Sequence, residues 1–267
     1  MSELLVVKLG GTTVAEQRGV LDEIAALSRR RPVVVVHGGG KRLTEWLERL
    51  GVPTRFEEGR RVTDEAGLEV AAAVLRGAAN SELVAALRQR GCDAIGLSGV
   101  DGGLVSGRRV AGMGRVVSVT QVRRTLVDVL VAAGLVPVIA PLATDEHGEI
   151  CNVNADDLAG GLARGLGARQ LVLLTDTDGI LGADGERIGR LSSADAERLI
   201  RKGVIDGGMV PKVRAAVAAI GRDPEAEAVI AEGFAVDALA RALSDPSVGT
   251  RVAADASAVT ASSARIG

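Results

Sequence analysis

The chain has 267 residues, of which 47% are hydrophobic and 25% charged, and its formal net charge is −2. With this balance and no cluster of basic residues, nucleic acid and anionic membranes are not expected as main partners. Aromatic residues make up 1% of the chain, so a platform on which nucleobases stack is not expected either.

The first forty residues contain two apolar runs that end in glycines. Residues 4–11 and 32–40 each consist of a valine-rich run followed by consecutive glycines. Because a helical pattern follows each run, both are predicted to be buried strands of an open α/β sheet. Glycine turns at the carboxyl ends of such strands present N–H groups to an anion. Lys8, beside the first turn, favours a site for a highly charged phosphate.

The rest of the chain alternates between helix and strand patterns. Helices are predicted at 19–27, 41–50, from 65 onward, 80–87, 125–133, 156–166, 192–201 and 209–220. Further strands are predicted at 93–98, 116–119 (exposed), 136–141, 171–176 and, as the last one, 228–230. Thr63-Asp64 and Asn80-Ser81 are expected to begin two of the helices. This alternation predicts an α/β fold, a three-layer αβα sandwich around a mainly parallel open sheet.

The remaining segments indicate the cellular setting. Residues from about 253 to 267 are rich in Ala and Ser without periodicity and are predicted to form a flexible tail. No apolar run approaches the roughly 20 residues of a membrane span, and no signal-peptide pattern precedes the first strand. Cys92 and Cys151 match no metal spacing and are expected to be buried, reduced thiols. These features predict a cytoplasmic protein.

Several common motifs are incomplete. Residues 38–41 lack the spacing and the Ser/Thr of a phosphate-binding P-loop, and no dinucleotide fingerprint opens the first helix. Ser98 lacks the glycine placement of a hydrolase nucleophile. His37 and His147 cannot form a metal site alone, and His37 is equally a candidate for a structural hydrogen bond and for catalysis.

Six segments in order resemble the acetylglutamate kinase branch of the amino acid kinase family. They are Lys8-Leu9-Gly10-Gly11, His37-Gly38-Gly39-Gly40, Arg60-Arg61-Val62-Thr63-Asp64, Gly96-Leu97-Ser98-Gly99-Val100-Asp101-Gly102, Asn152-Val153-Asn154-Ala155-Asp156 and Gly207-Gly208-Met209-Val210-Pro211-Lys212-Val213. The resemblance runs from about residue 4 to 252. Its strength comes from the shared order and spacing, since each motif alone is weak.

The resemblance implies an enzyme that transfers a phosphoryl group from ATP to the side-chain carboxylate of N-acetyl-L-glutamate in arginine biosynthesis. ATP with Mg²⁺ is then a co-substrate, and no prosthetic group or protein metal ligand is expected. The chain is expected to form a single domain. Its amino-acid-binding lobe would extend to about residue 165, and its nucleotide-binding lobe would cover about 166–252.

Three charged residues are the predicted catalytic set. Transfer between two anions requires positive charge around the transferring group. Lys8 and Lys212 match the family lysines that flank this group, and Asp156 matches the carboxylate that orients them. From the residues alone, Lys212 could equally be a solvated helix lysine, and Asp156 could be a helix N-cap.

Other matches assign the binding residues. Gly10, Gly11, Gly39 and Gly40 are expected to offer N–H groups to phosphate and acyl oxygens, because glycine lets the backbone approach closely. Gly39 and Gly40 also belong to the predicted amino-acid site.

Arg61 and Asn154 resemble the residues that hold the substrate α-carboxylate, and an arginine fork suits a carboxylate. Arg60 is expected to be a solvated charge. The predicted nucleotide-binding residues are Asp176, Gly179, Ile180, Met209 and Lys212.

Two departures from the family concern the region over the substrate and the N-terminus. The usual Leu-Gly-x-Val-Gly hairpin, which covers the substrate in the family, reads Gly112-Met113-Gly114-Arg115-Val116-Val117 here, so its second glycine is replaced by Val117. The short segment before Lys8 resembles the shorter, arginine-insensitive, homodimeric kind of enzyme.

Two other functions are alternatives. One is a kinase whose aminoadipate or glutamate substrate is attached to a small acidic carrier protein. Val62, Pro211 and residues 152–156 are closer to the branch that uses free N-acetylglutamate. The other is a non-catalytic amino acid or nucleotide sensor, which should have lost one of the charges of Lys8, Asp156 and Lys212. Other carboxylate or carbamate kinases also remain possible.

Overall fold

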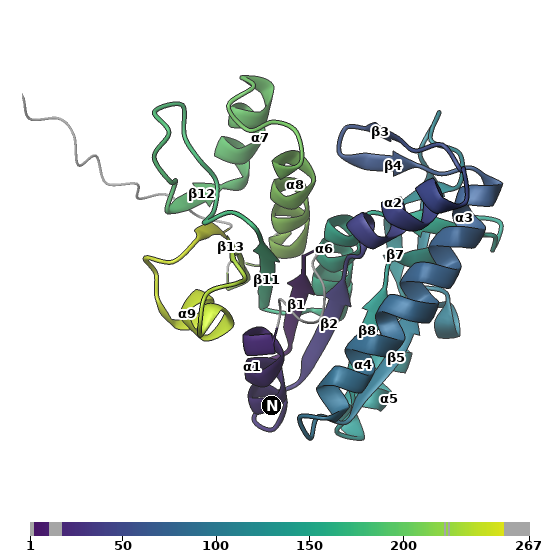
Figure 1. The fold of residues 1–267 in the computed structure, drawn as a ribbon. Helices are drawn as coiled ribbons and strands as arrows, with labels where there is room; N and C mark the ends of the chain where they lie inside the picture. Colours follow the sequence, from purple (N-terminus) through teal and green to yellow (C-terminus); the bar gives the residue numbers. More distant parts are fainter. Residues whose placement is uncertain (1–2, 11–17, 222, 224, 254–267) are drawn as a thin grey trace, which may run out of the picture.

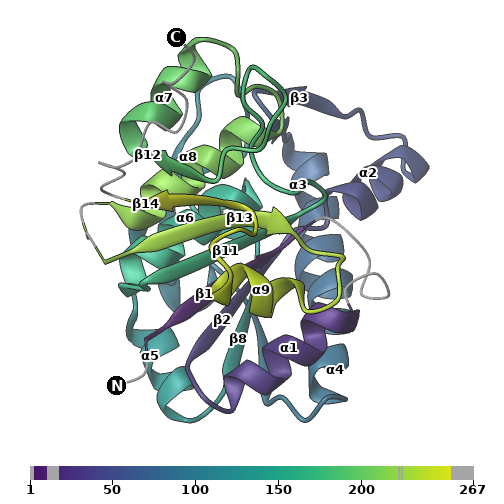
Figure 2. The same cartoon turned by 90° about the vertical axis from the view of Figure 1, so that its left-hand side faces the viewer.

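A computed structural model describes residues 3–10, 18–221, 223 and 225–253. Its centre is an eight-stranded sheet with the order β12-β14-β13-β11-β1-β2-β8-β5 (Figures 1 and 2). Its strands are β1 (Leu5–Leu9), β2 (Val33–His37), β5 (Ala94–Ser98), β8 (Val136–Ala140), β11 (Gln170–Thr175), β12 (Arg190–Ser192), β13 (Glu227–Glu232) and β14 (Thr250–Ala253). Every neighbouring pair is parallel except β13 and β14. The predicted sandwich around a mainly parallel sheet is therefore confirmed.

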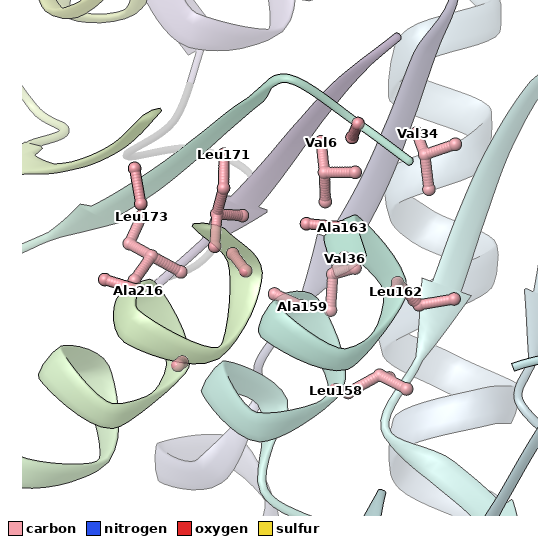
Figure 3. Packing of buried hydrophobic residues seen from close by; sticks show 14 of the residues in the cluster. Val6, Val34, Val36, Leu158, Ala159, Leu162, Ala163, Leu171, Leu173 and Ala216 are labelled. Carbon is pink, nitrogen blue, oxygen red and sulfur yellow. The ribbon is translucent and has the colours of Figure 1, made fainter. Parts of the chain in front are cut away.

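Helices cover both faces of this sheet, which explains why the central strands are apolar throughout rather than alternating. On one face lie α1 (Arg18–Ser28), α4 (Asn80–Arg88) and α9 (Ala238–Ser244). On the other face lie α5 (Thr125–Ala132), α6 (Ala155–Leu166) and α8 (Met209–Ile220). Figure 3 shows side chains of α6 and α8, among them Leu162 and Ala216, packed beneath Val6, Val36 and Leu173 of the sheet.

The segment from Glu65 to Arg88 is one continuous helix, where the sequence predicts two. It consists of α3 (Glu65–Ala71), a π-helical stretch η1 (Ala72–Ala79) and α4. Asp64 begins it as predicted, since its Oδ1 accepts from Gly67 N at 2.7 Å. Asn80 is the first residue of α4, as predicted, but its side chain caps no helix end among the described residues. It is wholly buried, and its side chain donates to the Val138 carbonyl at 2.9 Å.

Glu69, Arg76 and Glu82 interrupt the apolar sequence of this helix, so the expectation that no uninterrupted apolar run approaches a membrane span holds. By length and composition alone, Glu65–Arg88 could cross a membrane, with a mean hydropathy of 1.3 in its most apolar window. In the fold it packs against β5 and β8 of the sheet. It therefore lies where the core helix of a globular domain lies.

Smaller elements complete the structure. They are α2 (Gly40–Arg49), η2 (Asp101–Gly103), α7 (Ser193–Arg201), the hairpin of β3 (Arg55–Glu57) and β4 (Arg60–Val62), and a closed four-stranded barrel of β6 (Val105–Arg109), β7 (Val116–Val122), β9 (Leu142–Thr144) and β10 (Ile150–Val153). In Figure 1, α7 and α8 lie to the left of α2 and the β3–β4 hairpin, and both groups lie above β1 and β2.

Three expectations from the sequence, two about strands and one about the start of the tail, differ from the structure. Strand β7 is not an exposed strand, because Val116 and Val117 are buried in the barrel. The strand at 228–230 is not the last, because β14 adds a buried antiparallel strand beside it. Ala253, where the predicted tail begins, closes β14, and residues 254–267 lie outside the described part of the chain.

Candidate active site

Two lysines and one aspartate from three separate elements meet at the carboxyl end of β1. Lys8 Nζ lies 2.8 Å from one carboxylate oxygen of Asp156, and Lys212 Nζ lies 3.1 Å from the other. Lys8 and Asp156 are each only 5% exposed. The carboxylate therefore bridges the two ammonium groups and fixes the distance between them.

The helices that carry this cluster explain how it forms. Asn154 is the N-cap of α6, because its Oδ1 accepts from the N–H groups of Asp156 and Asp157 at 2.8 and 3.2 Å. The N-cap role considered for Asp156 is thus filled by Asn154, and Asp156 lies in the first turn. Lys212 lies in the first turn of α8. The positive ends of both helix dipoles therefore face the cluster.

The charges in the cluster depend on one another. Burial lowers the pKa of Lys8, while the Asp156 carboxylate acts in the opposite direction. Burial alone would raise the pKa of Asp156, but Lys8 and Lys212 outweigh it and hold this pKa below its ordinary value. Two ammonium groups around one carboxylate leave a net positive charge, which attracts an anion.

Two pockets meet at Lys8. A larger pocket of about 330 Å³ is lined by Lys8, Gly10, Lys41, Thr175, Asp176 and Lys212, among others. A smaller pocket of about 200 Å³ is lined by Lys8, Gly39, Gly40, Arg61, Asn154 and Asp156, among others. The geometry places the ammonium group of Lys8 between two compartments that could each hold one reactant.

Arg61 in the smaller pocket is a buried cation held by neutral groups. Its guanidinium donates to Thr54 Oγ1 at 3.2 Å, to Thr44 Oγ1 at 2.7 Å and to the Gly40 carbonyl at 3.0 Å. The Phe56 ring centroid lies 4.6 Å from it, and burial lowers its pKa. Within the described residues, no carboxylate forms an ion pair with it. A buried cation without a counter-ion favours a ligand that brings a negative charge.

Its neighbour Arg60 differs from the sequence expectation of a solvated charge. Arg60 Nη2 lies 2.7 Å from Asp157 Oδ2, and both side chains are largely buried. Burial raises the pKa of Asp157, and Arg60 opposes this effect. Adjacent strand residues point to opposite faces, so the two arginines serve different partners.

The structure describes three of the four glycines predicted to bind phosphate and acyl oxygens. Gly39 has a φ of 133°, and a Cβ there would lie 2.8 Å from Leu75 Cδ2. A Cβ at Gly10 would lie 3.1 Å from a carbonyl oxygen of β11, whereas one at Gly40 meets nothing within 4 Å among the described residues. Gly11 lies outside the described residues.

The predicted nucleotide residues are not all at the larger pocket. Asp176 lines it, and Lys212 connects it to the cluster. Gly179 and Ile180 pack beside Thr250, whose hydroxyl accepts from Ile180 N at 2.8 Å. Met209 is the first residue of α8 and packs against the core. Among the residues described, these three do not belong to the pocket lining.

The region over the smaller pocket differs in part from the family pattern. Val116 lines this pocket, and the 112–117 turn packs on Thr63, whose N–H donates to Met113 O at 3.1 Å. The β3–β4 hairpin also borders the pocket, and a Cβ at its Gly59 would lie 2.9 Å from Pro211 Cγ of α8. Val117 is accommodated because Gly107 on the adjacent strand leaves room for it.

Sequence reasoning missed several lining residues. Phe56 and Asn152 border the smaller pocket, and Lys41 borders the larger one. Asn152 Nδ2 donates to Thr63 Oγ1 at 3.1 Å, which ties β10 to the start of the long helix. An exposed Phe in a chain with so few aromatics was the available signal for Phe56.

Comparison with known proteins fits this geometry. The family model described as "Amino acid kinase family" matches residues 3–231. The chain belongs to the amino acid kinase family, which confirms the sequence-based assignment.

Within this family, the chain is similar to proteins named acetylglutamate kinase. One, from Rubrobacter xylanophilus, is 47% identical over 250 residues, which cover 93% of this chain and 96% of the relative. Another, from Geobacillus kaustophilus, is 41% identical over 237 residues, which cover 87% and 91%. The crystal structure of smu.665 from Streptococcus mutans has the same fold, with a TM-score of 0.80 at 24% identity, covering 96% of this chain and 100% of that one.

Proposed function

We propose that this chain phosphorylates the side-chain carboxylate of N-acetyl-L-glutamate with ATP, forming an acyl phosphate and ADP, in arginine biosynthesis. The observation that carries this proposal is the cluster of Lys8, Asp156 and Lys212 between two pockets. A cluster with a net positive charge between two pockets suits direct transfer between a phosphoryl donor and an acceptor. The similarity to acetylglutamate kinases over most of the chain supports the choice of acceptor.

The smaller pocket would bind the amino acid. Arg61 would pair with the α-carboxylate, and Asn154 would contact the same part of the substrate. The N–H groups of Gly39 and Gly40 would meet the acyl or transferring oxygens. No general base is needed, because the acceptor carboxylate is already ionised near neutral pH.

The larger pocket would bind ATP. Gly10 and, by family resemblance, Gly11 would approach the phosphates. Lys8 and Lys212 would stabilise the charge that spreads over the transferring group, with Asp156 holding both in place rather than acting as a base. Asp176 lines this pocket, whereas Gly179, Ile180 and Met209 would pack behind the residues that line it.

Magnesium would arrive with the nucleotide. In the described residues, no group of three or more His, Cys, Asp or Glu could hold a metal ion by itself. Coordination mainly by phosphate oxygens and water is consistent with Mg²⁺ chemistry. The ion would neutralise phosphate charge, and Asp176 is the acidic residue in the described lining of the larger pocket.

The wider setting is also proposed. We infer a homodimer in the cytoplasm that uses no prosthetic group and has neither nucleic acid nor membrane as a partner. We further infer an amino-acid lobe up to about residue 165 and a nucleotide lobe from about 166 to 252. Sedimentation would test the dimer.

Trapping with hydroxylamine tests the reaction. The protein is incubated with ATP, Mg²⁺ and one acceptor, either N-acetylglutamate, glutamate or aspartate, and the hydroxamate is measured. We expect product with N-acetylglutamate alone. Protein that binds ATP but yields no hydroxamate with any free amino acid would contradict the proposal and favour a carrier-linked substrate or a sensor.

A further inference from the structure

Beneath the Gly38–Gly40 turn lies a buried polar chain that the proposed reaction does not use directly. His37, the last residue of β2, is only 5% exposed, and Asn80 of the long helix is wholly buried. Asn80 Nδ2 lies 3.0 Å from His37 Nε2, and His37 Nδ1 lies 2.7 Å from the Gly38 carbonyl oxygen. Two buried polar side chains in an otherwise apolar layer are costly unless each is fully paired.

The partners of the ring determine its tautomer. The Asn80 amide nitrogen can only donate, so His37 Nε2 accepts from it and carries no proton. Nδ1 then carries the proton and donates to Gly38 O. Burial lowers the pKa of His37 to about 4, and the nearby Arg76 acts in the same direction. The ring is therefore neutral near pH 7, which rules out a role for it as a cation in the site.

The hydrogen bond to Gly38 O orients the next N–H group. The C=O and N–H of a trans peptide point in opposite directions, and no cis peptide occurs among the described residues. Because the Gly38 carbonyl points at the His37 ring, the Gly39 N–H points away from it. Gly38, Gly39 and Gly40 line the smaller pocket, and we take the Gly39 N–H, on the far side of the peptide from the ring, to face it.

The π-helical stretch η1 places the side chains that pack against His37 and the Gly38–Gly40 turn. A π turn holds one more residue than an α turn and so rotates the residues that follow. Asn80 comes directly after η1, which turns its side chain onto the sheet. A Cβ at Gly96 of β5 would lie 2.1 Å from Asn80 Oδ1, so a glycine is needed beneath it. From the same stretch, Leu75 packs where a Cβ of Gly39 would lie.

We propose that His37, held in one tautomer by Asn80, is a positioning residue that orients the Gly39 N–H toward the oxygen developing charge during phosphoryl transfer. This inference rests on the proposed function, because it takes the Gly39 N–H as a donor to the reacting groups. Removing one such donor outright lowers kcat by roughly 100- to 1,000-fold in enzymes that use them. Misorienting it should cost less, about 10- to 100-fold.

Two variants of the same residue separate positioning from structure. In His37→Asn, the amide nitrogen takes the place of Nδ1 and can still donate to Gly38 O. In His37→Leu, the side chain fills the space without a donor. We expect kcat to fall about 10- to 100-fold in His37→Leu, to stay within about threefold of the parent in His37→Asn, and the KM for ATP to change little in both.

Thermal unfolding shows that each variant is folded at the assay temperature. A folded His37→Leu with the parent kcat would overturn the inference, as would a folded His37→Asn that loses as much kcat as His37→Leu. An effect on the KM for ATP with kcat unchanged would also contradict it. If instead the parent forms no acyl phosphate, the proposed function fails, and that result is separate from the comparison of the two variants.

Discussion

Arg61 and Arg60 are adjacent residues of β4 whose side chains have opposite environments. Arg61 is a buried cation held by hydroxyl and carbonyl groups, whereas Arg60 is paired with Asp157. Removing a buried cation that has no counter-ion of its own should impair the binding of an anionic ligand. A buried cation that neutralises a carboxylate affects folding stability instead.

Replacing Arg61 should therefore impair substrate binding. We expect Arg61→Ala to raise the KM for N-acetylglutamate roughly 10- to 100-fold, the value of one charge-assisted hydrogen-bond pair, with the KM for ATP nearly unchanged. Steady-state kinetics with each substrate varied in turn measures this. A change confined to ATP would move Arg61 to the nucleotide site.

Arg60→Ala is the matched control. It leaves Asp157 buried without its partner, so we expect a loss of roughly 1–3 kcal/mol in the free energy of unfolding. Substrate KM should change much less than in Arg61→Ala. Denaturant unfolding measures the first effect, and equal KM effects in the two variants would contradict the distinction.

The sequence could predict which residue types gather at the site but not which of the two neighbouring arginines pairs with a carboxylate. Lys8, Asp156 and Lys212 follow from their motifs, and they do meet. Arg60 was misread because its partner Asp157 is 97 residues away. The buried hydrogen bonds of Asn80 were missed because its partners His37 and Val138 lie on strands that are distant in the sequence.

At the scale of elements, helices α6 and α8 determine the separation of Asp156 and Lys212. They approach each other closely at Gly160, where a Cβ would lie 2.5 Å from the Ala215 carbonyl oxygen. Because that atom is backbone, the helices would have to move apart to admit a side chain. Figure 3 shows both helices packed against the central strands.

Gly160→Ala should therefore reduce both stability and turnover. We expect a loss of roughly 1–3 kcal/mol, as for other overpacked cores, together with a lower kcat because Lys212 moves away from Asp156. Denaturant unfolding and initial rates measure the two effects.

Gly19→Ala in α1 is the control for a helical glycine. Among the described residues, a Cβ there meets nothing within 4 Å, so we expect a gain of about 0.5–1 kcal/mol from the better helix former. Similar effects of both substitutions would refute the close approach as the cause.

The elements themselves were predictable where burial is complete. Strands β1, β2, β8 and β11 are apolar runs bounded by turns, and their pattern is visible in the sequence. The hairpin β3–β4 and strands β6, β9, β10, β12 and β14 are short, and most of them are stabilised by partners far along the chain. Local patterns carry no information about such partners, and this explains why these strands were missed.

At the scale of the whole molecule, one buried histidine links folding to pH. Burial lowers the pKa of His37 from 6.5 to about 4. Between these values the unfolded chain binds a proton that the folded chain does not. Stability contributed by the neutral ring is thus present above about pH 6.5 and is lost as the pH falls toward 4.

The parent should accordingly lose about 3 kcal/mol of folding free energy from this residue between pH 6.5 and pH 4, whereas His37→Asn should not show this contribution. Denaturant unfolding at several pH values measures the difference between the two proteins. His147→Asn, which removes an exposed histidine, is measured alongside as a control. Parallel curves for the parent and His37→Asn would contradict a neutral, buried His37.

The central claim is that Lys8 and Lys212 together stabilise the transferring phosphoryl group. The most direct measurement is the rate of acyl phosphate formation, with saturating ATP, Mg²⁺ and N-acetylglutamate, in Lys8→Ala and Lys212→Ala, with the exposed Lys202→Ala as control. We predict losses of at least roughly 100-fold in both site variants, with the fold retained, and parental activity in the control. Near-parental rates in both site variants would contradict the account.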